Sequence, residues 1–131
     1  MRDVSEGIDP PIVVIEGWDF EFFETVADAL SSIEPWYPTW VPDYRAFDRL
    51  GRRLELVAEP PVVEKRILLG FLRTDNAHKS SLIIRPVAAE PSGREELVGL
   101  LRGYLREVEA GIDTEHLGLE ALWAQATSRA K

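Results

Sequence analysis

The stretch IVVIEGWDFEFFE, residues 12–24, decides the fold that the sequence predicts. Its first part, IVVIEG, is β-branched and apolar, which predicts a largely buried strand at 12–17. In the following WDFEFFE the side chains alternate, and the expected faces are Trp18, Phe20 and Phe22 against Asp19, Glu21 and Phe23. Such alternation is typical of a strand with one side exposed to water. We therefore expect two successive strands near the N-terminus.

A short helix is expected directly after these strands, in TVADALSSIEP. Apolar side chains recur there at helical spacing, Thr25 can cap the first turn, and Pro35 stops the helix. The segment YRAFDRLGRRLELVAE, residues 44–59, then alternates on both sides of a DRLGRR turn. It predicts a hairpin in which Gly51 supplies a positive φ.

The second half of the chain predicts more strands and then two helices. Residues 65–74 and 79–90 predict strands, although a buried helix would show a similar pattern at 65–73. Ser92 and Glu95 form a capping-box pattern before an apolar helical stripe that ends at Gly111. Asp113 or Thr114 is expected to cap the last helix, whose apolar side carries Leu119, Leu122, Trp123 and Ala126.

The order of these elements predicts an α+β fold: a single domain over residues 1–131 with an antiparallel sheet, a short N-terminal helix and two C-terminal helices. Residues 1–10 are expected to form a flexible N-terminus. A chain of this length can bury a hydrophobic core without covalent links. It has no cysteine, no long apolar run and no signal-peptide pattern, so we expect a soluble, cytoplasmic protein.

The excess negative charge lies in the first half of the chain. Residues 1–50 hold eleven acidic residues and three arginines, whereas residues 51–131 hold twelve residues of each sign. Nine of the twelve aromatic residues lie between Trp18 and Phe47. A surface that is acidic and aromatic repels nucleic acid and anionic membranes, and it accelerates the encounter with a basic protein.

Patterns that carry catalysis or bind cofactors are not found in the sequence. The two histidines, His78 and His116, lack metal-ligand spacing and are expected to be solvated. The serines show no Gly-x-Ser-x-Gly turn, and the glycines form neither a dinucleotide-binding nor a phosphate-binding loop. We therefore expect no catalytic residues, no metal and no cofactor.

The segment IEPWYPTWVPDYRAFD, residues 33–48, is the strongest candidate for a site. Tyr44 and Phe47 are expected to be core residues of the following strand. For Trp36, Tyr37 and Trp40 two interpretations stay open: a proline-stiffened lid over a sheet, or rings presented to a partner. In the second interpretation the rings would anchor a cationic partner surface, with acidic residues around them: Glu34, Asp43, Asp19, Glu21 and Glu24.

Two segments resemble a known class of proteins. DALSSIEPWYPTWVPDYRAFDRLGRRLEL, residues 28–56, and EELVGLLRGYL, residues 95–105, are similar to small α+β bacterial immunity-type proteins. The resemblance implies a protein that neutralises a polymorphic toxin by direct binding, and it carries over no catalytic residue.

The sequence thus favours a non-enzymatic acidic binding protein, an immunity protein that covers the surface of a basic toxin. Two alternatives stay open. One is a small hydrolase or isomerase with an aromatic-lined pocket, in which Asp43 or Glu34 is the base. The other is a self-associating subunit, a homodimer that buries the rings at a two-fold interface.

Overall fold

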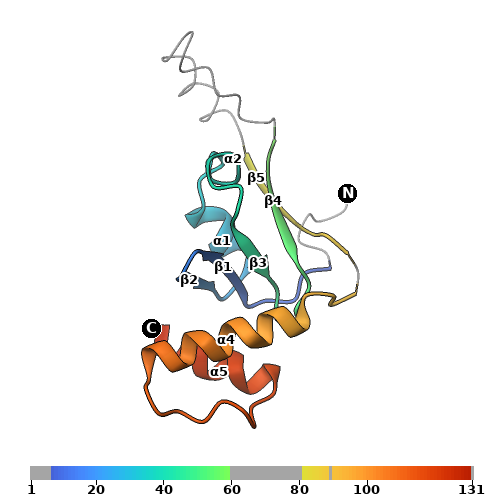
Figure 1. Cartoon of the computed structure of the whole chain (residues 1–131). Helices are drawn as coiled ribbons and strands as arrows, with labels where there is room; N and C mark the ends of the chain where they lie inside the picture. Colours follow the sequence, from blue (N-terminus) through green and yellow to red (C-terminus); the bar gives the residue numbers. More distant parts are fainter. Residues whose placement is uncertain (1–6, 60–80, 89, 131) are drawn as a thin grey trace.

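The structure, a computed structural model, describes residues 7–59, 81–88 and 90–130. It is a small α+β domain with antiparallel sheets and helices, as the sequence predicts (Figure 1). Its strands are β1 (Ile12–Glu16), β2 (Asp19–Phe23), β3 (Arg45–Phe47), β4 (Leu54–Glu59) and β5 (Ser81–Pro86). Its helices are α1 (Val26–Ser32), α2 (Tyr37–Trp40), α4 (Arg94–Val108) and α5 (Leu119–Ala130). The strand predicted at 65–74 lies outside the described residues.

The first sheet has the strand order β2-β1-β3, with antiparallel pairing throughout. The predicted pair of strands at 12–24 is confirmed. Glu16 pairs with Asp19, so Gly17 and Trp18 alone form the turn, and Gly17 has the positive φ of 60° that such tight turns favour. Trp18 therefore lies at the tip of the hairpin. The alternation predicts Trp18 on the same face as Phe20 and Phe22, and this prediction is wrong because Trp18 belongs to the turn.

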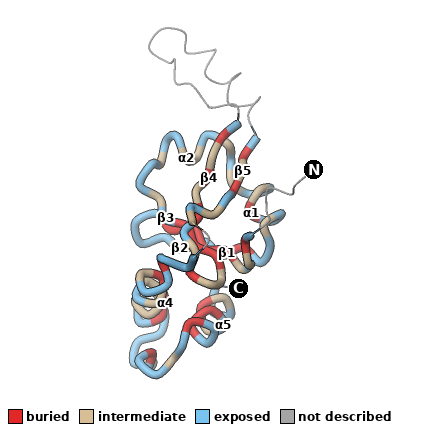
Figure 2. The backbone as a smooth tube through the Cα atoms, turned by 90° about the vertical axis from the view of Figure 1, so that its right-hand side faces the viewer, coloured by how far each residue is buried: buried red, intermediate tan, exposed pale blue. Residues whose placement is uncertain are grey.

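Two hydrophobic cores meet at the central strand β1. Ile12 and Val14 point into the first core with α1, β4 and β5, whereas Val13 and Ile15 point into the second core with α4 and α5. Figure 2 shows buried residues running through the strands and along the inner sides of both C-terminal helices. The apolar run of β1 is explained by this position, because both of its faces are covered.

The hairpin predicted at 44–59 is wrong in its pairing. β3 pairs with β1 and β4 pairs with β5, and only one isolated bridge, Phe47 to Arg53, joins β3 to β4. The turn between the two strands is nevertheless as expected, with Gly51 at a φ of 90°. Ala46 and Phe47 are both buried, so β3 is covered on both faces and completes the first sheet instead of extending the second.

The side chain of Asp48 holds this turn together. Asp48 is fully buried, and its Oδ1 accepts hydrogen bonds from the backbone N–H groups of Leu50 (3.0 Å) and Arg52 (2.9 Å). Its Oδ2 accepts from the N–H of Asp9 (3.2 Å) and lies 3.3 Å from Nη1 of Arg52. Close to this link, Ile8 packs into the first core. One carboxylate thus ties residues 8–9 to the turn that separates the sheets.

The predicted cap of α1 is confirmed, since the N–H of Asp28 donates to Oγ1 of Thr25 at 3.0 Å. The predicted capping box of α4 is wrong: Gly93, not Ser92, is the N-cap. A Cβ at Gly93 would lie 2.8 Å from the Phe47 ring and 2.9 Å from the carbonyl oxygen of Gly51. This close approach explains why a residue without a side chain stands there.

The C-terminal helices cover the second core. The stripe predicted for α4 is confirmed at its centre, where Leu97, Leu101 and Leu105 are buried. The predicted caps of α5 are wrong, because the helix begins at Leu119 and Asp113 instead accepts the N–H of Glu115 (3.1 Å) in the preceding loop. Among the described residues, no helix has the length and apolar character needed to cross a membrane.

Candidate functional site

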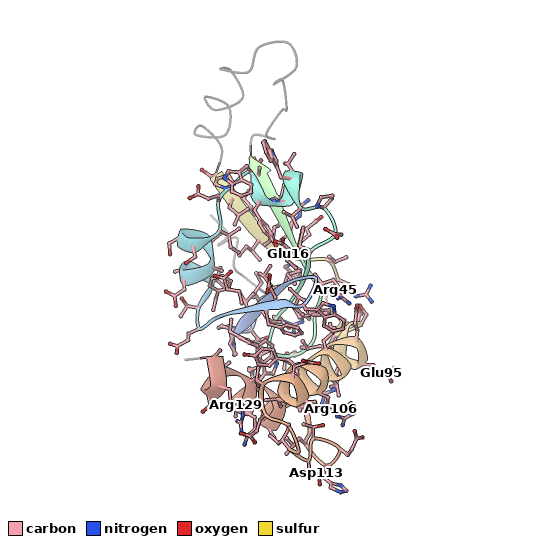
Figure 3. All side chains as sticks on the ribbon, turned by 60° about the vertical axis from the view of Figure 1, so that its left-hand side comes forward. Glu16, Arg45, Glu95, Arg106, Asp113 and Arg129 are labelled. Carbon is pink, nitrogen blue, oxygen red and sulfur yellow. The ribbon has the colours of Figure 1, made fainter. Side chains whose placement is uncertain are left out.

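A groove with a volume of about 450 Å³ lies beside the β1–β2 hairpin. One wall is the hairpin itself and the other is the chain that leaves α1 and enters α2. The lining residues are Val14, Glu16, Asp19, Phe20, Glu21, Ser32, Ile33, Glu34, Trp36 and Tyr37. We call this the acidic groove, because four of its lining residues carry carboxylates and none of the described lining residues is a lysine or arginine. In Figure 3, Glu16 lies between α2 above and α4 below.

The aromatic wall of the acidic groove is built by the short helix α2. Proline in the first turn fits the helical backbone there, and the N–H of Trp40 closes the turn on the carbonyl of Trp36 at 3.1 Å. The Trp36 ring lies 6.0 Å from the Trp40 ring and 6.4 Å from the Tyr37 ring, between centroids. The three rings therefore form one cluster, in which each ring restrains its neighbour.

The three rings are neither fully buried, as in a lid over a sheet, nor fully exposed, as in rings presented to a partner. Trp36 is 39% exposed and Trp40 is 40% exposed, whereas Tyr37 packs against the first core. The centroid of the Tyr37 ring also lies 5.9 Å from that of Tyr44, with the two rings tilted against each other, and the Tyr44 hydroxyl accepts the N–H of Leu56 in β4 at 2.7 Å. One side of the cluster is thus fixed to the fold and the other side faces solvent.

Tyr37 is the polar link between the two walls. Its hydroxyl donates a hydrogen bond to Oε1 of Glu16 across the groove at 3.1 Å. Burial raises the pKa of Tyr37 to about 12, and the hydrogen bond to Glu16 and the nearby charges of Glu21 and Asp43 contribute to the same direction. The phenol therefore stays neutral and donates to Glu16 at any physiological pH.

The predicted acidic residues are only partly brought together. Asp19, Glu21 and Glu34 line the acidic groove, on the same side of the molecule as Trp36 and Tyr37. Asp43 is exposed outside the lining, although its charge acts on Tyr37. Glu24 follows β2, is exposed and does not line the groove, and Trp40 is also absent from the lining.

Sequence reasoning missed Glu16, which lines the groove and binds Tyr37. It stands in the run 12–17, which the sequence predicts to be a largely buried strand. The tight turn at Gly17 was the available signal. It sets Glu16 beside Asp19, and a hairpin prediction at this point would have placed both carboxylates at one end of the strands.

The groove carboxylates are spread over its walls. Glu16, Asp19, Glu21 and Glu34 are all exposed, and no group of three or more His, Asp or Glu among the described residues is arranged to hold a metal ion. His116 is exposed in the loop before α5, 3.8 Å from Asp113, and His78 lies outside the described residues. The groove suits an extended cationic group better than a single small ion, because its negative charges do not converge.

Comparison of the chain with protein-family models, with curated proteins and with solved structures found no match. The resemblance to immunity-type proteins therefore depends on the sequence motifs alone, and the interpretation of the site depends on its own geometry.

Proposed function

We propose that this chain is a non-enzymatic binding protein of the cytoplasm, an immunity protein that neutralises a basic toxin by covering its surface. The observation that carries the proposal is the acidic groove, in which four carboxylates face a half-exposed aromatic wall and no lysine or arginine among the described residues lines the groove. Uncompensated carboxylates beside aromatic faces attract lysine and, above all, arginine side chains.

The distribution of charge supports a protein as the partner. The net charge of −8 comes from the N-terminal half, which also supplies both walls of the groove. A field of one sign attracts a basic surface and raises its association rate at low salt. Trp36 and Trp40 are restrained by each other and by α2, so little side-chain freedom is lost when a partner packs on them.

The enzymatic alternative places Asp43 or Glu34 as a general base in a pocket that shields it from water. Glu34 lines the groove and Asp43 lies near it, and both are exposed. The groove offers a hydrolase or isomerase no shielded carboxyl group among its lining residues. We therefore favour the binding function.

The test uses the product of the gene immediately upstream as the candidate partner. We expect that product to arrest growth when it is expressed alone, and coexpression of this chain to relieve the arrest. The purified proteins should form a stable complex whose association rate falls steeply with salt. A product that is harmless, or whose toxicity is unchanged by coexpression, would overturn the proposal.

Two matched variants assign the effect to the acidic groove. Glu21→Gln/Glu34→Gln removes two groove carboxylates and should lower the association rate about tenfold at low salt. Glu90→Gln/Glu95→Gln makes the same change of charge at exposed positions outside the groove and should leave the rate nearly unchanged. Equal effects of the two variants would show that total charge, not the groove, governs binding.

The self-associating alternative is tested on the chain alone. Sedimentation at micromolar and higher concentrations should show a monomer, since the proposed function leaves the aromatic wall free for another protein. A dimer that dissociates on Trp36→Ala would instead assign the wall to a two-fold interface.

A further inference from the structure

We propose that the contact surface does not end at the acidic groove but continues around the tip of the β1–β2 hairpin onto α4, with Trp18 as its anchor. This inference rests on the proposed function and names a second part of the same surface. Its occupant is an arginine side chain of the same basic protein partner.

Trp18 is the most exposed large apolar side chain among the described residues, at 87%. It stands at the second position of the two-residue turn between β1 and β2. Neither core includes it, so its ring contributes little to the burial that stabilises the fold. An indole held in a tight turn and open to solvent is well placed to bury a large area on binding, and tryptophan is enriched among residues that dominate binding energy.

A second hollow of about 300 Å³ lies beside this ring. Its lining residues are Trp18, Phe20, Gly103, Tyr104 and Glu107. Phe20 and Tyr104 pack together at 4.9 Å between centroids and form an aromatic floor. Phe20 also lines the acidic groove, so the two hollows share a residue and lie on either side of the hairpin. We call the second hollow the Trp18 hollow.

Gly103 keeps the Trp18 hollow open. It lies inside α4, where glycine stabilises a helix less than alanine does. Close packing does not require it, since a Cβ at this position would meet no atom within 4 Å. A longer side chain at position 103 would occupy the hollow between Trp18 and Tyr104. Because position 103 carries no side chain, a ligand has access to the aromatic floor.

The chemistry of the lining selects the occupant. Three aromatic rings and the carboxylate of Glu107 line the hollow, and within the described part of the chain no lysine or arginine does. An arginine side chain matches this set, because its stem is apolar, its planar guanidinium stacks on aromatic faces, and its N–H groups bind carboxylates. The same preference for cations holds in the acidic groove, so one basic surface can fill both hollows.

The four tryptophans allow a direct test by NMR, because each indole N–H gives one signal. The probe is a nonapeptide of arginine, titrated into the 15N-labelled chain. We expect the Trp18 and Trp36 signals to shift with the same dissociation constant. The Trp123 signal is the internal reference and should not move, since this indole is buried and donates to the carbonyl of Arg49 at 2.9 Å.

Each other outcome decides between the two proposals. If Trp36 shifts and Trp18 does not, the extension to the Trp18 hollow is overturned and the acidic groove remains. If neither signal shifts, the attraction of the groove for cations fails as well. If Trp18 shifts alone or with a different dissociation constant, the two hollows are not one surface and the inference is overturned as stated.

Three variants separate specific packing from general attraction of charge, because none of them alters the net charge. Trp18→Ala should weaken peptide binding about tenfold or more while the melting temperature stays unchanged. Gly103→Leu should fill the hollow and weaken binding to a similar degree without loss of stability. Gly99→Leu, one turn away in α4 and outside the lining of the hollow, is the matched control and should bind as the native chain does. Equal binding by Gly103→Leu and Gly99→Leu would overturn the role of the hollow.

Discussion

Replacement of Asp48 tests the link that fixes the turn between the two sheets. In Asp48→Ala, the backbone N–H groups of Leu50, Arg52 and Asp9 lose their acceptor in a part-buried site, and the Arg52 guanidinium loses a carboxylate partner. A donor left without a partner costs about 1–3 kcal/mol when it is buried, and water reaches this site in part. We therefore expect the free energy of unfolding to fall by about 4 kcal/mol.

Asp48→Asn is a milder change that tests the same prediction. The amide oxygen can keep the two hydrogen bonds that Oδ1 accepts, but the amide N–H₂ then faces the N–H of Asp9 and the guanidinium of Arg52. We expect a loss of about 2 kcal/mol, half of that for alanine.

Urea denaturation at neutral pH, followed by far-UV circular dichroism, measures both losses. An alanine variant within about 1 kcal/mol of the native chain would refute the reasoning, because the N–H groups would then be satisfied by water at no cost. Equal losses for alanine and asparagine would refute the assignment of separate roles to the two carboxylate oxygens.

Four further outcomes follow from the structure. Trp123→Ala removes a ring that is 3% exposed and its hydrogen bond to Arg49, so thermal denaturation should show a loss of about 3–5 kcal/mol. The raised pKa of Tyr37 makes folding favour the neutral phenol, so its contribution to stability is complete below pH 10 and is lost as the pH rises through about 12. Glu16→Gln should lower that pKa, because it removes a charge and a charged acceptor, and the absorbance of tyrosinate measures the change. Gly99→Ala should raise the free energy of unfolding by about 0.5–1 kcal/mol, since position 99 is exposed, helical and free of close neighbours.

Local patterns predict the elements of this fold well and their pairing less well. The alternation at residues 18–24 and the stripe on α4 give the correct elements, because burial on one side imposes a period on the sequence. The hairpin at 44–59 fails because partner choice depends on distant residues. β3 pairs with the edge of β1 that β2 leaves open, and β5 pairs with β4 although the two strands lie far apart in the sequence.

The same limit applies to the caps of the C-terminal helices. Ser92 and Glu95 satisfy the local capping pattern, yet the approach of Gly93 to Phe47 and Gly51 decides where α4 begins. Phe47 and Gly51 lie more than forty positions earlier in the chain. A tertiary contact of this range leaves no periodic signal, and only the glycine itself indicates it.

For the candidate site, sequence reasoning finds the types of residue but not their arrangement. It names Trp36, Tyr37 and three of the four groove carboxylates, because acidic and aromatic residues are concentrated in this part of the sequence. It misses Glu16, which depends on the register of the hairpin. Sequence reasoning also cannot distinguish exposed acidic residues from the buried Asp48. The burial of Asp48 follows from its contacts with the turn and with Asp9.

The β1–β2 hairpin contributes to the cores with one part and lines the two hollows with the other. The side chains of Ile12–Ile15 stabilise both cores, whereas the six positions from Glu16 to Glu21 supply five residues that line the two hollows. Under the proposed function, substitutions at this tip change which partner is bound while both cores stay intact, so related chains can diversify in specificity without losing the ability to fold. Because these lining residues lie within one short hairpin, the hairpin is a compact segment to transplant into another scaffold.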